Sequence, residues 1–589
     1  MEFSGAGYSR IVALARAALL PKRVIPLVLL LGVVGLFLEQ LDPAGSGWRA
    51  AVTLVDYALI TLTALEILVA FAQSPVKTKY FRRHIFSIGF FLLFAALFFL
   101  ARFSTALGSE AGSLGYLTAI VVRNLFLTLK VFSRIRSLSS FVRGLMNHPA
   151  QTVVLSFALV ILVGTLLLMM PVATLDGEGL SPTEALFTAT SAVCVTGLVV
   201  VDTATVFTFW GWIVILLLIQ IGGLGIMALS YFTIFVMRRS ITHEDTTVLS
   251  YMLDEGNVGE IRAALTRIVG FTFGFEGVGA LLLGLGFWSD GMAPLRSLFY
   301  GLFHAVSAFC NAGFALFTRS LEQFAGNSLI NSVVVVLIIA GGISFVVLTD
   351  LWRLFLRRRG KLEAPTFSLG AGTRAILAVT GIALGASFFL FYFMEHGAAM
   401  AELSFGEQLL ATLFQAVTLR TAGFNTLPTD QFRTATYLAM MAFMFIGGAS
   451  GSTAGGIKVN SVAVIWSYLR SVRRGTQDAL LFLRRVSRTQ VATAFSVLLF
   501  GVASIFTATF VLSISESFSL LEIAFESVSA FATVGLSTGI TGGLSLTGRL
   551  VIVLLMFIGR VGPLTLLSAS SGQEERLRVR YPPADISVG

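Results

Sequence analysis

Long apolar runs follow one another along almost the whole chain, with short polar segments between them. The runs cover 24–38, 51–72, 85–101, 152–171, 210–237, 268–287, 328–351, 376–393, 437–446, 491–512 and 550–567. Most of them approach the roughly 20 residues that cross a bilayer as an α-helix. The apolar runs that do not reach this length are interrupted by glycine clusters. This succession predicts an all-α membrane protein that crosses the bilayer many times.

Four short segments with a common pattern lie between these runs. Each begins with Phe, continues with small and Ser/Thr residues, and ends in Gly followed by Leu or Phe. The segments are 187–198, 303–314, 414–424 and 525–536, and their glycines are Gly197, Gly313, Gly423 and Gly535. Successive glycines lie 116, 110 and 112 residues apart, and the third segment is one residue shorter. Recurrence at a nearly fixed period predicts an internal repeat.

Each copy has a long apolar run before it and another after it. A segment of about a dozen residues is too short to span a bilayer and predicts a re-entrant helix. Irregular backbone at membrane depth is tolerated only inside protein or along an aqueous path. We therefore predict four helix–pore-loop–helix repeats around one ion pore, with about four transmembrane helices before them. The predicted domains are 1–150 (accessory helices), 151–240, 260–359, 370–480 and 488–571 (pore repeats 1 to 4), and 572–589 (a cytoplasmic tail).

The chemistry of the four loops suits a cation. A short helix that points its C-terminus into the membrane presents partial negative charge there. A glycine after the helix lets backbone carbonyls turn toward the axis and replace the hydration shell of an ion. Thr196, Thr421 and Thr533 could add hydroxyl oxygens, and no carboxylate lies inside the loops. Magnesium demands charged or water-rich ligation, so the loops favour a large monovalent ion.

These residues resemble the Trk/Ktr/HKT superfamily of potassium transporters over about residues 150–571. The third copy, RTAGFN at 420–425, is especially similar to the third filter of that family. The resemblance implies potassium binding at a filter made of Val195, Thr196, Gly197, Leu198, Asn311, Ala312, Gly313, Phe314, Thr421, Ala422, Gly423, Phe424, Thr533, Val534, Gly535 and Leu536. It also implies that four glycines go with potassium selectivity, and that serine at the first filter goes with sodium-favouring members.

A glycine cluster follows each filter glycine by 24 to 28 residues, and the third, at 447–458, is the largest. So many glycines destabilise a helix, which predicts an irregular segment inside the span. The resemblance places an intramembrane gate here, made of Gly447, Gly448, Gly451, Ser452, Thr453, Gly455, Gly456, Lys458 and Arg560. Two alternatives stay open. Gly222 and Gly341 could serve close helix packing only, and Arg560 could be a structural ion-pair partner.

Other polar residues near the repeats have structural interpretations. Glu184, Glu522 and Glu526 are expected near the starts of the pore helices, where acids are favoured. His304 is expected to be a packed residue rather than a proton relay. Two buried thiols are favoured over a disulfide between Cys194 and Cys310, which occupy the same repeat position. Arg420 holds that position in the third repeat, where it tunes the pore mouth or anchors a loop.

The first 150 residues carry apolar stretches near 24–38, 51–72, 85–102 and 114–133. Arg123 and Lys130 in the fourth stretch, with Asp56 and Glu66 in the second, resemble a voltage-sensor module only weakly. An accessory domain or a dimer contact is favoured.

The net charge of +10 and a pI of about 9.8 would suggest nucleic acid in a soluble protein. Here 56% of the residues are hydrophobic, the mean hydropathy is +0.88, and the basic residues cluster beside the apolar runs. Basic loops stay in the cytoplasm. We expect a multi-pass protein of the bacterial inner (plasma) membrane with both termini cytoplasmic and no nucleic-acid partner. No cleavable signal peptide is evident, and two cysteines do not make a disulfide framework.

The leading functional prediction is potassium uptake driven by the membrane potential. A sodium-coupled or sodium-conducting relative is the alternative, and a non-conducting sensor is a third. A membrane-embedded enzyme is disfavoured because no zinc motif or paired intramembrane Asp is present. The chain has no nucleotide-binding motif and no covalently bound cofactor is expected. The resemblance implies membrane lipid, a homodimer and a separate cytosolic nucleotide-binding regulatory subunit as partners. The basic segments 353–361 and 470–488 are candidate docking surfaces, with orientation and lipid contact as the alternative.

Overall fold

The computed structural model describes residues 149–225, 258–359, 369–562 and 565–566, together with scattered helical residues between 57 and 96. In the N-terminal part, Ile60 and Phe91 pack against each other. The predicted stretches at 24–38 and 114–133, with the residues compared to a voltage sensor, lie outside the described residues. So does the tail at 572–589.

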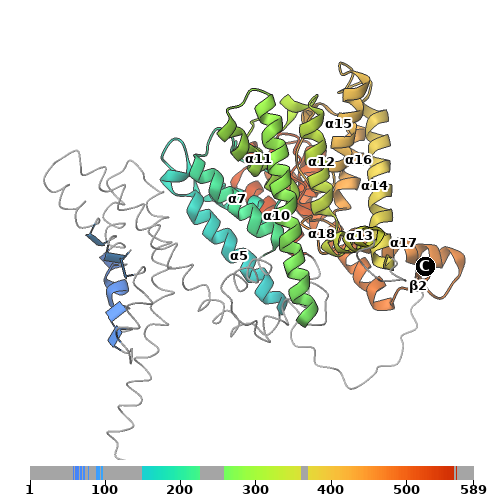
Figure 1. Cartoon of the computed structure of the whole chain (residues 1–589), viewed down its shortest axis with the longest axis horizontal. Coiled ribbons are helices and arrows are strands. Elements are labelled where there is room, and N and C mark those ends of the chain that lie inside the picture. Colours follow the sequence, from blue (N-terminus) through green and yellow to red (C-terminus); the bar gives the residue numbers. More distant parts are fainter. Residues whose placement is uncertain are drawn as a thin grey trace, which may run out of the picture.

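The rest of the described chain folds as four successive helical units (Figure 1). Unit 1 holds α5 (Pro149–Leu168), α6 (Pro182–Val193) and α7 (Phe209–Leu224). Unit 2 holds α10 (Val258–Ser289), α11 (Pro294–Phe309), α12 (Ser328–Gly342) and α13 (Phe345–Arg358). Unit 3 holds α14 (Ala371–Glu395), α15 (Phe405–Thr418), α16 (Thr434–Phe445) and α17 (Val459–Arg474). Unit 4 holds α18 (Arg488–Ser515), α19 (Leu520–Ala532) and α20 (Leu546–Val561).

Short elements complete the described chain. A small antiparallel hairpin of β1 (Leu480–Leu481) and β2 (Arg484–Arg485) follows α17, with Leu480 paired to Arg485 and Leu481 to Arg484. Single 3-10 turns are η1 (Pro171–Ala173), η2 (Glu322–Phe324), η3 (Thr429–Gln431) and η4 (Thr541–Gly543).

The long helices of units 2 to 4 have the length and composition of membrane spans. Among the described residues, three helices qualify alone: Thr266–Ser289 within α10, Ala371–Glu395 and Arg488–Ser515. Their outer faces carry exposed apolar side chains such as Leu281, Ile382 and Phe506. A water-soluble chain rarely exposes so many large apolar residues on adjoining helices. The mostly helical, apolar architecture therefore agrees with a membrane protein.

The short helices lie inside the long ones and form the most buried part of the described structure. Phe187, Phe303, Phe414 and Phe525, the first residues of the four repeated segments, are all fully buried. Three of the short helices begin with a capping box, in which a serine side chain and a glutamate three residues later satisfy each other's backbone amides. The pairs are Ser181 with Glu184, Ser404 with Glu407, and Ser519 with Glu522.

The structure corrects one sequence expectation about these caps. Glu184 and Glu522 start their helices as expected, but Glu526 lies in the middle of α19, fully buried. There it accepts a hydrogen bond from Thr541.

The apolar run at 328–351, which holds one of the four glycine clusters, is interrupted. It forms two helices, α12 and α13, which meet at an angle of 107°. The chain leaves the helix at Ile343, whose backbone is extended, and Ser344 caps the new helix by accepting from the amide of Val346. Two glycines followed by a capping residue make this break favourable.

Candidate ion-conduction site

The four repeat glycines come together in a closed ring. A methyl group on Gly197 would lie 3.1 Å from the Cα of Gly313, and one on Gly313 would lie 2.9 Å from the Cα of Gly423. One on Gly423 would lie 3.3 Å from the Cα of Gly535, and one on Gly535 would lie 3.0 Å from the Cα of Gly197. The glycine of each unit therefore contacts the glycine of the next unit, more than 100 residues away in the chain. The glycine of unit 4 contacts that of unit 1 and closes the ring.

A backbone carbonyl oxygen lies against each glycine of this ring. It belongs to the residue before the glycine of the next unit. The methyl positions are 2.5 Å from Ala312 O at Gly197, 2.8 Å from Ala422 O at Gly313 and 2.5 Å from Val534 O at Gly423, and Thr196 O is the closest atom at Gly535. Because these distances are shorter than real carbon–oxygen contacts, the ring has no room for a side chain on any of the four glycines.

The same backbone conformation recurs in all four loops. The glycines have positive φ, at 91° for Gly197, 71° for Gly313, 78° for Gly423 and 88° for Gly535. The residues two positions earlier also have positive φ: Val195 (49°), Asn311 (58°), Thr421 (68°) and Thr533 (51°). Such values are costly for β-branched residues. Alternation between left-handed and ordinary backbone turns successive carbonyls toward the same side, which is the arrangement that coordinates a cation.

A hydroxyl from each short helix holds the loop that follows it. Ser191 accepts from the amide of Gly197 and Ser529 from the amide of Gly535, both at 3.1 Å. The equivalent hydroxyls of Ser307 and Thr418 donate to the carbonyls of Phe314 (2.8 Å) and Phe424 (2.6 Å). None of these four residues was predicted to have a role. Their shared position in the repeat alignment was the signal that could have identified them.

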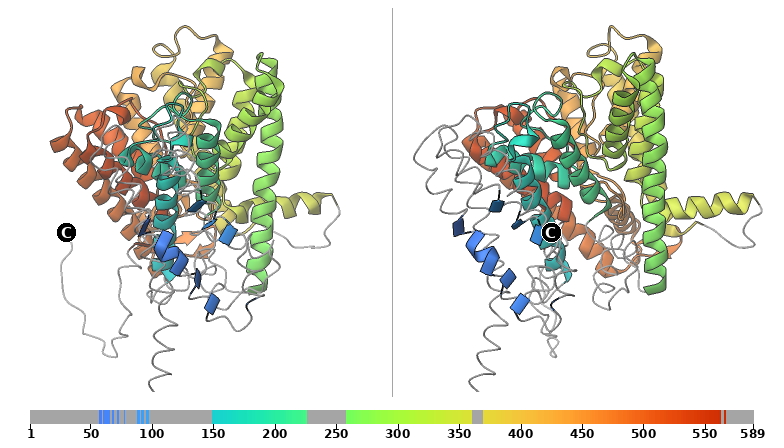
Figure 2. Two further views of the ribbon diagram at one scale, coloured as in Figure 1. Left: turned by 90° about the vertical axis from the view of Figure 1, so that its left-hand side faces the viewer. Right: turned by 60° about the vertical axis from the view of Figure 1, so that its left-hand side comes forward.

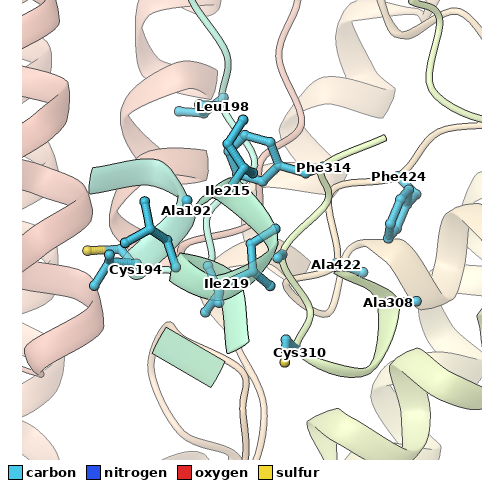
Figure 3. Close-up of a cluster of buried hydrophobic side chains, with 14 of the residues drawn as sticks. Ala192, Cys194, Leu198, Ile215, Ile219, Ala308, Cys310, Phe314, Ala422 and Phe424 are labelled. Carbon is cyan, nitrogen blue, oxygen red and sulfur yellow. The ribbon is translucent and has the colours of Figure 1, made fainter. Parts of the chain in front are cut away.

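The remaining filter candidates line or support the ring. Leu198, Phe314, Phe424 and Leu536, which follow the glycines, are buried in the surrounding core (Figure 3 labels the first three). Thr196 and Thr533 carry buried hydroxyls with no hydrogen-bond partner in the described part of the chain. The Thr421 hydroxyl accepts from the side-chain Nδ2 of Asn311 at 3.5 Å.

The predicted gate residues form an irregular loop between α16 and α17. The amides of Ala449 and Thr453 donate to the carbonyls of Gly342 and Gly341 in unit 2, both at 3.1 Å. Gly455 packs directly against Thr533 of the fourth filter. The loop backbone uses positive φ at Gly451 and Gly456, and the hydroxyl of Ser452 donates to Ala449 O at 2.7 Å. Gly447 and Gly448 pack against Gly455 and Ala454 within the loop. We call residues 447–458 the gate loop below.

Arg560 joins the gate loop to unit 1. Its guanidinium donates to the carbonyl of Thr453 in the loop and to the carbonyl of Gly222 at the end of α7. The loop belongs to unit 3, and Gly222 belongs to unit 1, which stands opposite in the glycine ring. A single side chain of unit 4 therefore links two units that face each other across the glycine ring. No carboxylate of the described residues pairs with Arg560, so its ion-pair interpretation is not supported.

Two further cations hold the gate loop from its ends. Arg420, buried beside the third filter, donates to Gly447 O at 3.1 Å. This hydrogen bond is the loop-anchoring alternative of the sequence analysis, and it ties filter to loop directly. Lys458 donates to Ala454 O at 2.7 Å and to Gly455 O at 3.3 Å.

Comparison with known proteins identifies this architecture. The family described as "TrkH: Cation transport protein" matches residues 117–575. The Ktr system potassium uptake protein B of Bacillus subtilis is 37% identical over 446 residues, which cover 75% of this chain and 97% of that protein. The chain belongs to the Trk/Ktr superfamily. Members of this superfamily are transporters, so the expectation that the chain is not an enzyme is confirmed.

Two further matches agree with this membership of Trk/Ktr. The potassium/sodium uptake protein NtpJ of Enterococcus hirae is 34% identical over 75% of this chain and 97% of its own length. The crystal structure of the potassium transporter TrkH from Vibrio parahaemolyticus superposes with a TM-score of 0.58, covering 83% of this chain and 97% of that chain at 18% identity. Because TrkH is only 18% identical, this superposition supports the fold and not the function.

Glycines of the inner helices have a packing role in this Trk/Ktr chain. Gly222, Gly341 and Gly559 lie directly against the carbonyls of Val193, Phe309 and Phe531 near the ends of the short helices. The packing alternative considered for the first two therefore describes their contacts. In unit 3 the helix is broken at this level, and the gate loop takes its place.

The buried His304 and the two cysteines are structural. The Nδ1 of His304 lies 2.7 Å from Tyr300 O, and its Nε2 accepts from the amide of Leu316 at 3.3 Å. Both ring nitrogens are therefore used, as expected for a packed residue. Cys194 and Cys310 are free and buried, and Figure 3 shows their sulfur atoms apart.

Glu276 is a buried acid that was not among the predicted functional residues. It lies in α10, and its Oε1 accepts from Gln220 Nε2 of α7 at 3.1 Å. The sulfur of Cys310 is 3.8 Å from the same oxygen. The signal was available, because an ionisable residue within an apolar run is a functional candidate by default.

Proposed function

We propose that the chain takes up potassium across the membrane through the ring of four filter glycines. The closed ring of glycines and carbonyl oxygens carries the proposal, because it offers several uncharged oxygens and no carboxylate. Replacement of a hydration shell by carbonyl oxygens suits a weakly hydrated monovalent cation. The short helices end three to five residues before the glycines, so their partial negative ends add to the field at the ring.

The names of the relatives support the choice of ion. The Bacillus subtilis relative is a potassium uptake protein, and the Enterococcus hirae relative is a potassium/sodium uptake protein. Because the Enterococcus hirae relative is named for both ions, sodium conduction or sodium coupling remains the competing function. In the family that the chain resembles, serine at the first filter goes with sodium-favouring members. Glycine at position 197 therefore favours potassium over sodium.

The gate loop supports regulation of this path. We infer that its present position, held by Arg420, Arg560 and the corner of α12 and α13, closes the path below the ring. Opening then requires the loop to leave these carbonyl contacts. The four units act as the four pore repeats in this proposal.

The wider setting follows from the same proposal. The chain lies in the bacterial plasma membrane, with its basic segments and both termini in the cytoplasm and lipid around α10, α14 and α18. A second copy forms a homodimer with one pore in each chain. A separate cytosolic subunit that binds nucleotide controls the gate, and its docking surface includes basic residues of the hairpin after α17.

Uptake of rubidium-86 into proteoliposomes that hold the purified protein and an outward potassium gradient tests the proposal. We expect uptake that external potassium blocks and equal sodium does not. In Gly197→Ser, sodium should become an effective competitor. Equal block by both ions in the wild type would replace potassium selectivity by the sodium-type function. Absence of uptake both alone and with the cytosolic subunit of a Ktr system would refute transport.

A further inference from the structure

Helix α13 has the geometry of a helix that lies in the plane of the membrane surface. It meets α12 at 107°, and α12 packs against the spanning helix α10. Figure 2 shows α13 projecting sideways from the bundle, nearly perpendicular to α10. A helix at this angle to a span runs along the bilayer surface rather than through it.

Contacts at both sides fix the depth of α13. Trp352 packs edge-on against Phe271, with ring centroids 6.5 Å apart, and Phe271 lies near the first residue of the span Thr266–Ser289. On the other side, the hydroxyl of Thr373, near the start of α14, donates to Asp350 at 2.6 Å. The apolar runs of the two helices, at 268–287 in α10 and 376–393 in α14, both begin near this level, although α10 itself continues beyond it. Helix α13 therefore lies at the membrane boundary that faces the cytoplasm in the proposed orientation.

The surface of α13 combines exposed apolar and basic side chains. Val346, Trp352 and Phe355 are 55%, 50% and 43% exposed. Arg353 and Arg358 are exposed and form no ion pair within the described residues. Tryptophan at the headgroup level and basic residues beside anionic headgroups are the features of interfacial helices.

The inner face of α13 is joined to the gate loop. The amide of Phe345, its first residue, donates to Gly451 O at 3.1 Å. Val347 is fully buried in one cluster with Ala449 and Val459, at the two ends of the loop. A displacement of α13 therefore moves the contacts that hold the loop, because closely packed groups transmit small shifts.

We propose that α13 binds the anionic phospholipids of the inner leaflet and that this binding holds the gate loop in its closed position. The occupant is lipid rather than protein because the helix lies at the boundary and its exposed face pairs apolar rings with unpaired guanidinium groups. The proposal rests on the proposed transport function and on the cytoplasmic placement of the basic residues. It adds a ligand class and a route from that ligand to the gate.

The first test measures lipid binding without transport. The full chain is placed in vesicles of phosphatidylcholine that contain brominated phosphatidylglycerol or brominated phosphatidylcholine, and tryptophan fluorescence is compared between wild type and Trp352→Phe. The difference isolates Trp352. We expect stronger quenching by the anionic lipid at equal fraction, and loss of this preference in Arg353→Gln/Arg358→Gln. Quenching by neither lipid would show that protein, such as a second copy or a regulatory subunit, covers the face, and would overturn the proposal.

The second test measures rubidium-86 uptake as phosphatidylglycerol replaces phosphatidylcholine. We expect uptake by the wild type to fall as the anionic fraction rises. Each arginine near an anionic surface strengthens association about fivefold, so the double variant should need a much larger fraction for the same inhibition. Arg473→Gln/Arg474→Gln, which removes two exposed charges at the end of α17, outside both α13 and the hairpin, is the matched control and should behave as wild type when no cytosolic subunit is present.

The outcomes separate the two proposals. Uptake that responds to lipid identically in wild type and the α13 variant overturns the lipid proposal and leaves transport intact. Equal loss of the response in the control variant also overturns it, because the effect would then be one of total charge. Absence of uptake in every lipid refutes the transport function, while the quenching measurement still decides the lipid contact.

Discussion

Substitution of Gly197 by alanine is the sharpest probe of the glycine ring. The new methyl group would lie 2.5 Å from Ala312 O, and real Cβ atoms essentially never come within 3.0 Å of another heavy atom. The carbonyl must therefore move by about 0.5 Å or more, which is the tolerance of a preorganised binding site. The positive φ of 91° adds a backbone cost of about 1–2 kcal/mol for any residue with a side chain.

A matched control separates these two effects. Gly539 has a φ of 97°, and a methyl group there would meet nothing within 4 Å. Gly539→Ala therefore carries the same backbone strain without the collision, four residues beyond the fourth filter glycine. Comparing the two variants isolates the displacement of the carbonyl.

Rubidium-86 uptake with potassium and sodium as competitors is the assay. Misplacing one coordinating oxygen at a cost of about 1.4 kcal/mol corresponds to about tenfold in binding. We expect Gly197→Ala to lower uptake by at least that factor and to reduce the advantage of potassium over sodium. Gly539→Ala should stay within about twofold of wild type. Unchanged selectivity in Gly197→Ala, or equal losses in both variants, would refute the view that this carbonyl lines the path.

Three further substitutions test the gate loop, the filter anchors and the buried acid. Arg560→Gln removes charge-assisted hydrogen bonds of about 1.5–3 kcal/mol each from the loop, so basal rubidium uptake should rise several-fold with unchanged selectivity; a fall in uptake would contradict a closing role. Ser191→Ala removes the hydrogen-bond acceptor of the Gly197 amide, a loss of about 1 kcal/mol, and should raise the rubidium concentration that half-saturates uptake about fivefold. An unchanged half-saturating concentration would show that this hydrogen bond does not hold the loop. Glu276→Leu leaves the Gln220 amide unpaired and should destabilise the protein by about 1–3 kcal/mol in a thermal-shift measurement, with Glu276→Gln closer to wild type; equal midpoints for both would exclude the hydrogen bond as the cause.

The sequence predicted best where one residue type is physically required. A loop with positive φ and a neighbouring carbonyl in contact accepts only glycine, so four glycines at one repeat position located the ring before any geometry was known. The break at the gate loop followed in the same way from five glycines in twelve residues. In these places the backbone constraint leaves a signature in the residue itself.

The contacts of Arg560 and the bend before α13 leave no such signature. The partners of Arg560 are backbone carbonyls, which every residue has, so no sequence pattern names them. The GGIS segment at 341–344 favours a break, but its residues do not set the angle, which also depends on hydrogen bonds to the gate loop. The anchoring residues share one position of the repeat and were visible there, but Ser and Thr in a membrane helix have several roles.

The closure of the ring has a consequence for how the transporter is made. Unit 1 leaves the ribosome first and unit 4 last, yet Gly535 must pack against Gly197, and the hydrogen bond from Arg560 to Gly222 spans 338 residues. In the proposed function, ion selection and the closing latch are both completed by α20 and its short partner α19. A chain whose synthesis stops before them possesses three quarters of a filter and no latch. Because one chain supplies all four quarters, each can also change during evolution without changing the other three, a freedom that a ring of identical subunits lacks.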